Sequence, residues 1–157
     1  MKAVLQFKDY HVVETIYKFD PYFEEDNVEE DNVEEDNVEE DNVDIKPRIL
    51  FKLSVNNDNN KEAIVGLGIE FGDIEMKNAP IYVKARVLGE FVINEMEQDL
   101  SEEQIIAFYK RNGVAILFPY LRSLVSDLTS KGSETPIIIP TMNVAAMVNK
   151  IKENFDE

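Results

Sequence analysis

The chain has 157 residues, of which 32 are acidic and 16 are basic, and its formal net charge is −16. Segment 24–43 holds 12 of the acidic residues and no basic one, so the remainder carries 20 acids against 16 bases. A mildly acidic fold argues against nucleic acid as a partner. The absence of cysteine excludes disulfides, thiolate metal sites and cysteine nucleophiles.

The length predicts a single domain over residues 1–157, because about 130 residues outside segment 24–43 are enough for one modest core. The first residues, MKAVLQFKDYHVV, are too polar for a secretory signal. No run approaches the roughly 18 apolar residues of a membrane span. We therefore expect a cytoplasmic protein that does not insert into membranes.

A long strand is predicted over residues 2–19. Ala3, Leu5 and Phe7 share one parity, whereas Val12 and Ile16 share the other with Val4 and Tyr10. One extra residue near 9–11, a β-bulge, would produce this switch. A strand of this length could pair beyond its own subunit.

An acidic loop is predicted over residues 21–47, and it contains the unit EEDNV four times at 24–43. A period of five fits neither a heptad nor a solenoid, and the like charges repel one another, so we expect an expanded, solvated loop. Loose Ca²⁺ binding by the clustered oxygens is the alternative. Because the segment lacks the glycine turn of a calcium loop, we predict no metal site.

Three further strands are predicted at Arg48–Val55, Glu62–Phe71 and 81–94, each with apolar residues on one face. The cluster NNDNN between the first two indicates a hairpin. On the other face of the second, Gly66 and Gly68 leave a shallow trough. Four strands joined by turns, each apolar on one side, predict an antiparallel sheet that needs a cover.

The last third of the chain supplies that cover. A capping box, Ser101 with Gln104, begins a short helix that we expect to end at Asn112 and Gly113. A second helical segment then runs to Gly132, and Pro119 either bends it or lies in its first turn. A final helix is predicted over 144–155. The fold class is therefore α+β, a four-stranded antiparallel sheet covered on one face by a long helix, an extended crossover and a short C-terminal helix.

The crossover carries three isoleucines, 137–139, between Pro136 and Pro140. Two amide donors are missing, so ordinary central sheet pairing is disfavoured. The run projects apolar groups to both sides, and only one side can face the core. Exposed apolar area of this kind marks an interaction site. The alternative is an extended segment packed on the sheet or on another subunit.

Residues 117–144, LFPYLRSLVSDLTSKGSETPIIIPTMNV, resemble the corresponding part of the SecB family of protein-export chaperones. The resemblance implies small acidic subunits that form homotetramers, as dimers of dimers, without ATP or any other cofactor. It also implies that they hold unfolded precursor proteins in hydrophobic grooves and deliver them to the translocase motor SecA. Carried over to this chain, the client-binding groove would consist of Phe118, Tyr120, Leu124, Ile137, Ile138, Ile139 and Met142.

The resemblance also implies acidic residues for SecA docking near the end of the first strand. Glu14 and Asp20 share a parity there, but Lys18 lies between them, and the spacing departs from the family pattern. Some relatives are dedicated chaperones of toxin–antitoxin pairs, so a scaffold or chaperone for one partner is the alternative role.

No enzyme site is predicted. His11 is the only histidine and lies within a strand, where we interpret it as a structural or surface residue. The sequence Gly66-Leu67-Gly68 lies in mid-strand and opens no helix, so it is not a phosphate loop. A pocket on the sheet that binds a small hydrophobic ligand is a third alternative, but the subunit is small for enclosing such a ligand.

Overall fold

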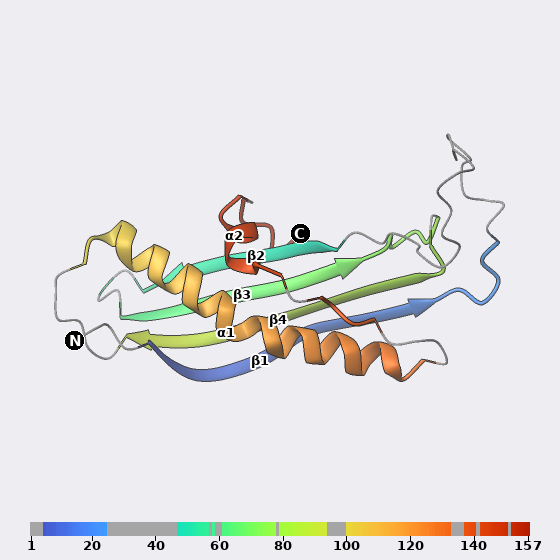
Figure 1. Ribbon diagram of the computed structural model, residues 1–157, viewed down its shortest axis with the longest axis horizontal. Helices are drawn as coiled ribbons and strands as arrows, with labels where there is room; N and C mark the ends of the chain where they lie inside the picture. Colours follow the sequence, from blue (N-terminus) through green and yellow to red (C-terminus); the bar gives the residue numbers. More distant parts are fainter. Residues whose placement is uncertain are drawn as a thin grey trace.

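The computed structural model describes residues 5–24, 47–56, 58, 61–77, 79–93, 100–132, 137–140, 142–150 and 152–157. Its elements are β1 (Leu5–Phe19), β2 (Arg48–Val55), β3 (Glu62–Phe71), β4 (Ile81–Ile93), α1 (Glu102–Ser130) and α2 (Val144–Val148). The strands form one antiparallel sheet in the order β1-β4-β3-β2, crossed on one face by α1 (Figure 1). The predicted fold class is confirmed. Residues 25–46, with most of the EEDNV repeat, lie outside the described residues.

The two ends of the acidic segment lie at opposite edges of the sheet. β1 pairs with β4, and β2 pairs with β3, so the chain passes from one edge strand to the other between residues 20 and 47. The bounds of β2 and β3 agree with the prediction, and β4 agrees as far as it is described. The sheet therefore has two edges, β1 and β2.

β1 changes register against β4 twice, between Phe7 and Asp9 and between Val12 and Glu14. The first shift is the predicted bulge, and it leaves Phe7 and Val12 on the face that α1 covers. The second shift was not predicted. It places Ile16 opposite Lys84 on the uncovered face, so the expectation that Ile16 shares a face with Val12 is wrong.

α1 is one continuous helix of 29 residues, begun by the predicted capping box. The expected break at Asn112 and Gly113 is wrong. The Asn112 amide donates to the Phe108 carbonyl at 2.9 Å within the helix. A Cβ on Gly113 would lie 2.8 Å from Val65 Cγ2, so this glycine lets the helix approach β3 closely and does not end it.

Pro119 lies in the interior of α1, so its placement in a first turn is wrong. Figure 1 shows the helix axis changing direction about halfway along, as the missing hydrogen bond of an interior proline favours. Among the described helices, none has the combination of length and apolar character that a membrane span requires.

The core lies between α1 and the sheet, and its largest fully buried members include Tyr109, Phe91, Leu67 and Leu117. α2 ends at Val148, so the predicted helix over 144–155 is wrong in its extent. Further along, Asn154 bonds with the backbone of β2: its Oδ1 accepts from the Phe51 N–H at 2.9 Å. Residues 152–154 are therefore not helical, and a turn follows at residues 155–156.

Replacing Gly113 with leucine should lower the free energy of unfolding by about 1–3 kcal/mol, because the new side chain overpacks the contact with Val65. Leucine in place of the exposed Ala107 on the same helix should change it by less than about 0.5 kcal/mol. Urea denaturation followed by circular dichroism measures both. Equal stability of the two variants would show that the helix does not depend on this close approach.

Candidate functional site: the crossover and its helix

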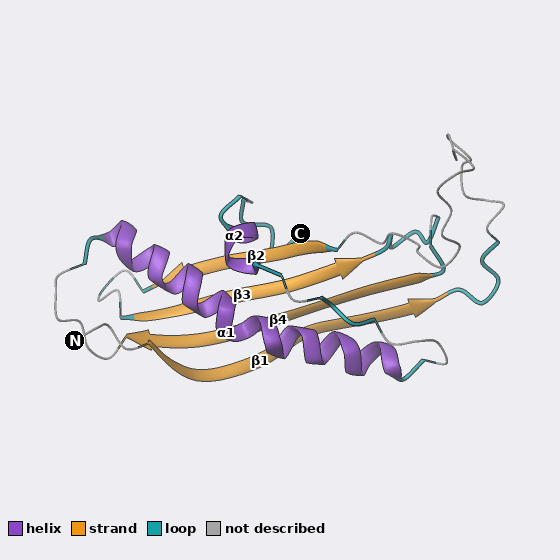
Figure 2. Ribbon diagram, in the orientation of Figure 1, coloured by secondary structure: helices purple, strands orange, loops and turns teal. Residues whose placement is uncertain are grey.

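The three isoleucines of the crossover differ sharply in exposure. Ile138 is 71% exposed, Ile139 is 1% exposed, and Ile137 is half-buried against the core. This is the alternation of an extended segment with one side against the sheet. Figure 2 shows the described part of the crossover between α1 and α2 on the covered face. Ile138 therefore presents an apolar side chain to solvent from a well-packed support.

Two side chains of α1 hold the crossover backbone in place. The Ile137 N–H donates to Thr129 Oγ1 at 2.8 Å, and the Arg122 Nε–H donates to the Ile139 carbonyl at 2.9 Å. Thr129 is 2% exposed, and its hydroxyl donates in turn to the Val125 carbonyl. These bonds satisfy backbone groups that no neighbouring strand pairs. They fix the segment on both sides of Ile138.

The sequence interpretation missed Thr129 and gave Arg122 no role. The two residues are seven positions apart, which is close to two helical turns, so they lie on one side of α1. That spacing was a usable signal. It could not be interpreted without knowing that the crossover returns along this side of the helix.

The predicted groove residues of α1 divide between two sides of the helix. Phe118 is buried, and the Arg122 guanidinium lies 5.9 Å from its ring centroid, on the side of the crossover. Tyr120, two positions on, points the opposite way and is 45% exposed. Leu124 follows Tyr120 by one turn and is half-buried, as is Met142 after the crossover. Within this subunit, Phe118 and Tyr120 therefore face different sides of α1.

Tyr120 belongs to an aromatic cluster on β1. Its ring centroid lies 5.6 Å from Phe7 and 5.0 Å from Tyr10, and Phe7 stacks on Phe91 at 5.2 Å. Burial, and then the neighbouring Tyr120, raise the pKa of Tyr10, so this phenol stays neutral well above pH 7. Together with Val12, which is 46% exposed, these residues form what we call the β1 surface: Phe7, Tyr10, Val12 and Tyr120. The first bulge, detectable as a parity switch, brings Phe7 and Tyr10 onto one face.

The two acidic residues considered for docking differ in their surroundings. Glu14 lies on the uncovered face, where its Oε1 is 2.9 Å from Arg86 Nε and 3.5 Å from Lys84 Nζ. Asp20 accepts a hydrogen bond from the Tyr22 N–H just after β1. The charge of Glu14 is therefore compensated within the sheet.

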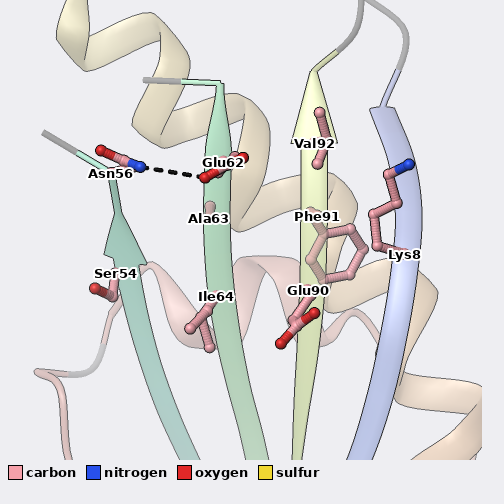
Figure 3. A pocket seen from close by; sticks show the side chains of 9 residues that line it. All are labelled: Lys8, Ser54, Asn56, Glu62, Ala63, Ile64, Glu90, Phe91 and Val92. Carbon is pink, nitrogen blue, oxygen red and sulfur yellow. Dashed lines mark hydrogen bonds between the residues drawn. The ribbon is translucent and has the colours of Figure 1, made fainter. Parts of the chain in front are cut away.

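A hollow of about 630 Å³ lies near one end of the sheet, on strands seen in Figure 3 in front of the helix. Glu62, which accepts from the Asn56 amide at 3.2 Å, and Glu90 give it an acidic lining. The lining residues are Lys8, Ser54, Asn56, Glu62, Ala63, Ile64, Glu90, Phe91 and Val92. The lining thus combines two exposed carboxylates and Lys8 with apolar side chains.

His11 lies beside this hollow in an exposed cluster. Its Nε2 is 3.3 Å from Asp9 Oδ2 and 3.9 Å from Glu90 Oε1. All three side chains are exposed. Sequence reasoning did not foresee the cluster, because Glu90 reaches His11 only through the β1–β4 register. The position of the histidine agrees with its interpretation as a surface residue.

The family model described as preprotein translocase subunit SecB matches residues 22–154. An uncharacterized protein of Methanocaldococcus jannaschii is 36% identical over 83 residues, which are 53% of this chain and 51% of that protein. The protein-export protein SecB of Anaplasma phagocytophilum is 28% identical over 93 residues, 59% of this chain and 58% of that one. The matches thus span about half the length of these curated relatives.

Among solved structures, the chain is similar to a SecB-like chaperone of Mycobacterium tuberculosis in complex with an antitoxin peptide. The TM-score is 0.56 at 16% identity, over 88% of this chain and 90% of that one. At this identity the likeness shows a shared fold. The family model covers most of the sequence, including α1, the crossover and α2. The chain belongs to the SecB family.

Proposed function

We propose that this protein is an ATP-independent chaperone, a holdase that binds unfolded proteins through the apolar surface around Ile138. The observation that carries the proposal is the exposed Ile138 side chain on a crossover hydrogen-bonded to α1 on both sides. Leaving such a side chain in water forgoes on the order of 1.5–3 kcal/mol, which a bound apolar segment restores. Family membership supports the same role.

Unfolded clients have no fixed shape, so the surface that binds them cannot depend on shape complementarity. Ile138 offers apolar contact, and the half-buried Ile137 and Met142 beside it extend that contact. Methionine adapts to different partners because its side chain is unbranched and polarizable. A surface built in this way selects exposed apolar side chains and not a particular sequence.

The proposal includes assembly into a homotetramer, as a dimer of dimers, through the β1 surface. β1 is a 15-residue edge strand, and edges of that length invite pairing with another chain. Val12 and Tyr120 add exposed apolar area next to it, and Tyr10 stays neutral. Joining subunits here would leave Ile138, on the other side of α1, free for clients.

If the holdase acts in protein export, it delivers its clients to SecA. The name of the matching family supports it. Of the two acids considered, Asp20 is the better candidate for docking, since Glu14 is paired with Arg86 and Lys84. A cytoplasmic site of action would follow from such a role.

A dedicated chaperone for one partner, such as an antitoxin, is the second candidate. The solved relative that shares the fold is described in complex with an antitoxin peptide. The range of clients distinguishes the two roles. A general holdase should suppress aggregation of several unrelated unfolded proteins at similar stoichiometry, whereas a dedicated chaperone should protect one partner only.

Replacing Ile138 with aspartate should weaken suppression of client aggregation by about tenfold in the chaperone concentration required, because a charge replaces the main apolar contact. Light scattering of a denatured client without ATP measures this. Ile74→Asp is the control, since Ile74 is 57% exposed in the β3–β4 connection. Full activity of the Ile138 variant, or an equal loss in both variants at unchanged far-UV spectra, would contradict the proposal.

Thr129→Val should remove the acceptor of the Ile137 N–H while nearly preserving side-chain shape, at a cost of about 1–3 kcal/mol. We expect faster hydrogen exchange at 137–139 and weaker client protection, because the crossover is no longer fixed. Ser130→Ala removes a neighbouring exposed hydroxyl and should do neither. Unchanged exchange in the Thr129 variant would mean that this hydrogen bond does not hold the crossover.

Tyr120→Asp should shift the assembly toward smaller species, because it places a charge in the β1 surface. Light scattering coupled to gel filtration should give four times the chain mass for the natural protein and less for the variant. Tyr22→Asp, at a side chain that is 87% exposed, serves as the control. A tetramer of unaltered stability in the Tyr120 variant would place the subunit contact elsewhere.

A further inference from the structure

Residues 152–157 leave the covered face and wrap round the β2 edge onto the opposite face of the sheet. Asn154 bonds with the edge through both its backbone and its side chain: its N–H donates to the Phe51 carbonyl at 3.1 Å. Its side chain accepts from the Phe51 N–H at 2.9 Å and donates to the Ile49 carbonyl at 3.1 Å. Figure 1 shows this end of the chain beside β2. The edge of β2 is thus occupied by a short segment that turns over residues 154–157, where the Glu157 N–H donates to the Asn154 carbonyl at 3.3 Å.

The next side chain, Phe155, fills the trough left by the glycines of β3. A Cβ on Gly66 would lie 2.9 Å from its ring, so only glycine leaves room for an aromatic side chain here. The ring is 3% exposed and lies between two cations, with its centroid 4.9 Å from Lys52 Nζ and 5.0 Å from Arg86 Cζ. This is a pocket for one aromatic group, separate from the core on the other face.

The surroundings of the pocket are basic. Arg48, Lys52, Lys84 and Arg86 all lie on the uncovered face of β2 and β4, on either side of the glycines. Two carboxylates of the sheet pair with them: Glu70 lies 3.2 Å from Arg48, and Glu14 contacts Lys84 and Arg86. These four cations and two anions leave an excess of two positive charges.

The bound segment supplies the two missing negative charges. Glu157 lies 2.6 Å from Arg48, and Asp156 lies 3.6 Å from Lys52. The backbone takes part as well, since Arg86 donates to the Phe155 carbonyl at 2.9 Å. Both carboxylates remain mostly exposed, so their ion pairs are individually weak and exchange readily. The segment is anchored by the Phe155 ring and by two residues at the edge, Asn154 and Glu153, whose carboxylate accepts from the Leu53 N–H at 3.1 Å.

We propose that the β2 edge and the Gly66 trough form a binding site for a short segment of another protein that bonds to the edge, turns onto the uncovered face, and carries an aromatic residue followed by acidic residues. Residues 154–157 are the resident and displaceable occupant of this site. Backbone pairing at a sheet edge with a side-chain pocket beside it is a recurrent mode of peptide recognition. The site lies on the face opposite Ile138 and does not depend on the proposed holdase function.

The test is binding of a fluorescein-labelled peptide KENFDE, the sequence of residues 152–157, measured by anisotropy at low salt. Phe155→Ala in the full chain should free the pocket and bind the peptide at least about tenfold more tightly than the natural protein, whose own segment competes at high effective concentration. Tyr22→Ala removes an aromatic side chain without contact to the pocket and should behave as the natural protein. The peptide KENADE should not bind.

The double variant Phe155→Ala/Gly66→Ala should not bind the peptide, because the new Cβ at residue 66 takes up space that the phenylalanine ring of the peptide needs. In this variant only the flexible Lys52 side chain has to move to make room for the Cβ. A second way to open the site is the double variant Asp156→Lys/Glu157→Lys, which changes only exposed side chains. The new lysines are repelled by the basic residues around the pocket, so the resident segment should leave the site even if Phe155→Ala disturbs folding. Ile138→Asp should leave peptide binding unchanged. No binding by either opened variant at native far-UV spectra would overturn the proposal, as would equal binding by the variant with Gly66→Ala.

Discussion

The close packing of α1 against β3 and β4 determines where the other parts of this face lie. It depends on Gly113, where the helix passes within side-chain contact of Val65, and on the buried Leu117 and Leu121. From that position α1 presents Thr129 and Arg122 to the crossover on one side and Tyr120 to β1 on the other. One helix therefore organises two apolar surfaces that point in different directions.

The crossover illustrates how a short segment can be exposed and still ordered. Its backbone lacks strand partners, so a helix hydroxyl and a guanidinium replace them. Ile139 anchors it in the core, and Ile138 consequently stays in solvent. An apolar side chain on such a support can bind a partner without first paying the entropy of ordering the segment. Among the described residues, this is the feature that best accounts for a holdase.

The fold was largely predictable because the strands alternate cleanly and the capping box at Ser101 marks the start of α1. The predicted helix break failed because Asn112 and Gly113 have the local character of a stop, and only the approach to β3 shows why a glycine is needed within the helix. The prediction of how far the last helix extends failed for a similar reason. Pairing of Asn154 with β2 is a tertiary contact that local periodicity does not encode.

The candidate site was predictable in part. The proline-bounded run indicated that one isoleucine faces the core and one faces solvent, but not which. Phe118 and Tyr120 are two positions apart, and this spacing places them on opposite sides of a helix, but it was not used in the prediction.

Under the proposed function, clients bind at residue 138. Photocrosslinking from that position, with position 74 as control, to a denatured client without ATP tests it most directly. We expect adducts from position 138 that disappear when the client is folded. Absence of adducts at 138, or equal yields at both positions, would contradict it.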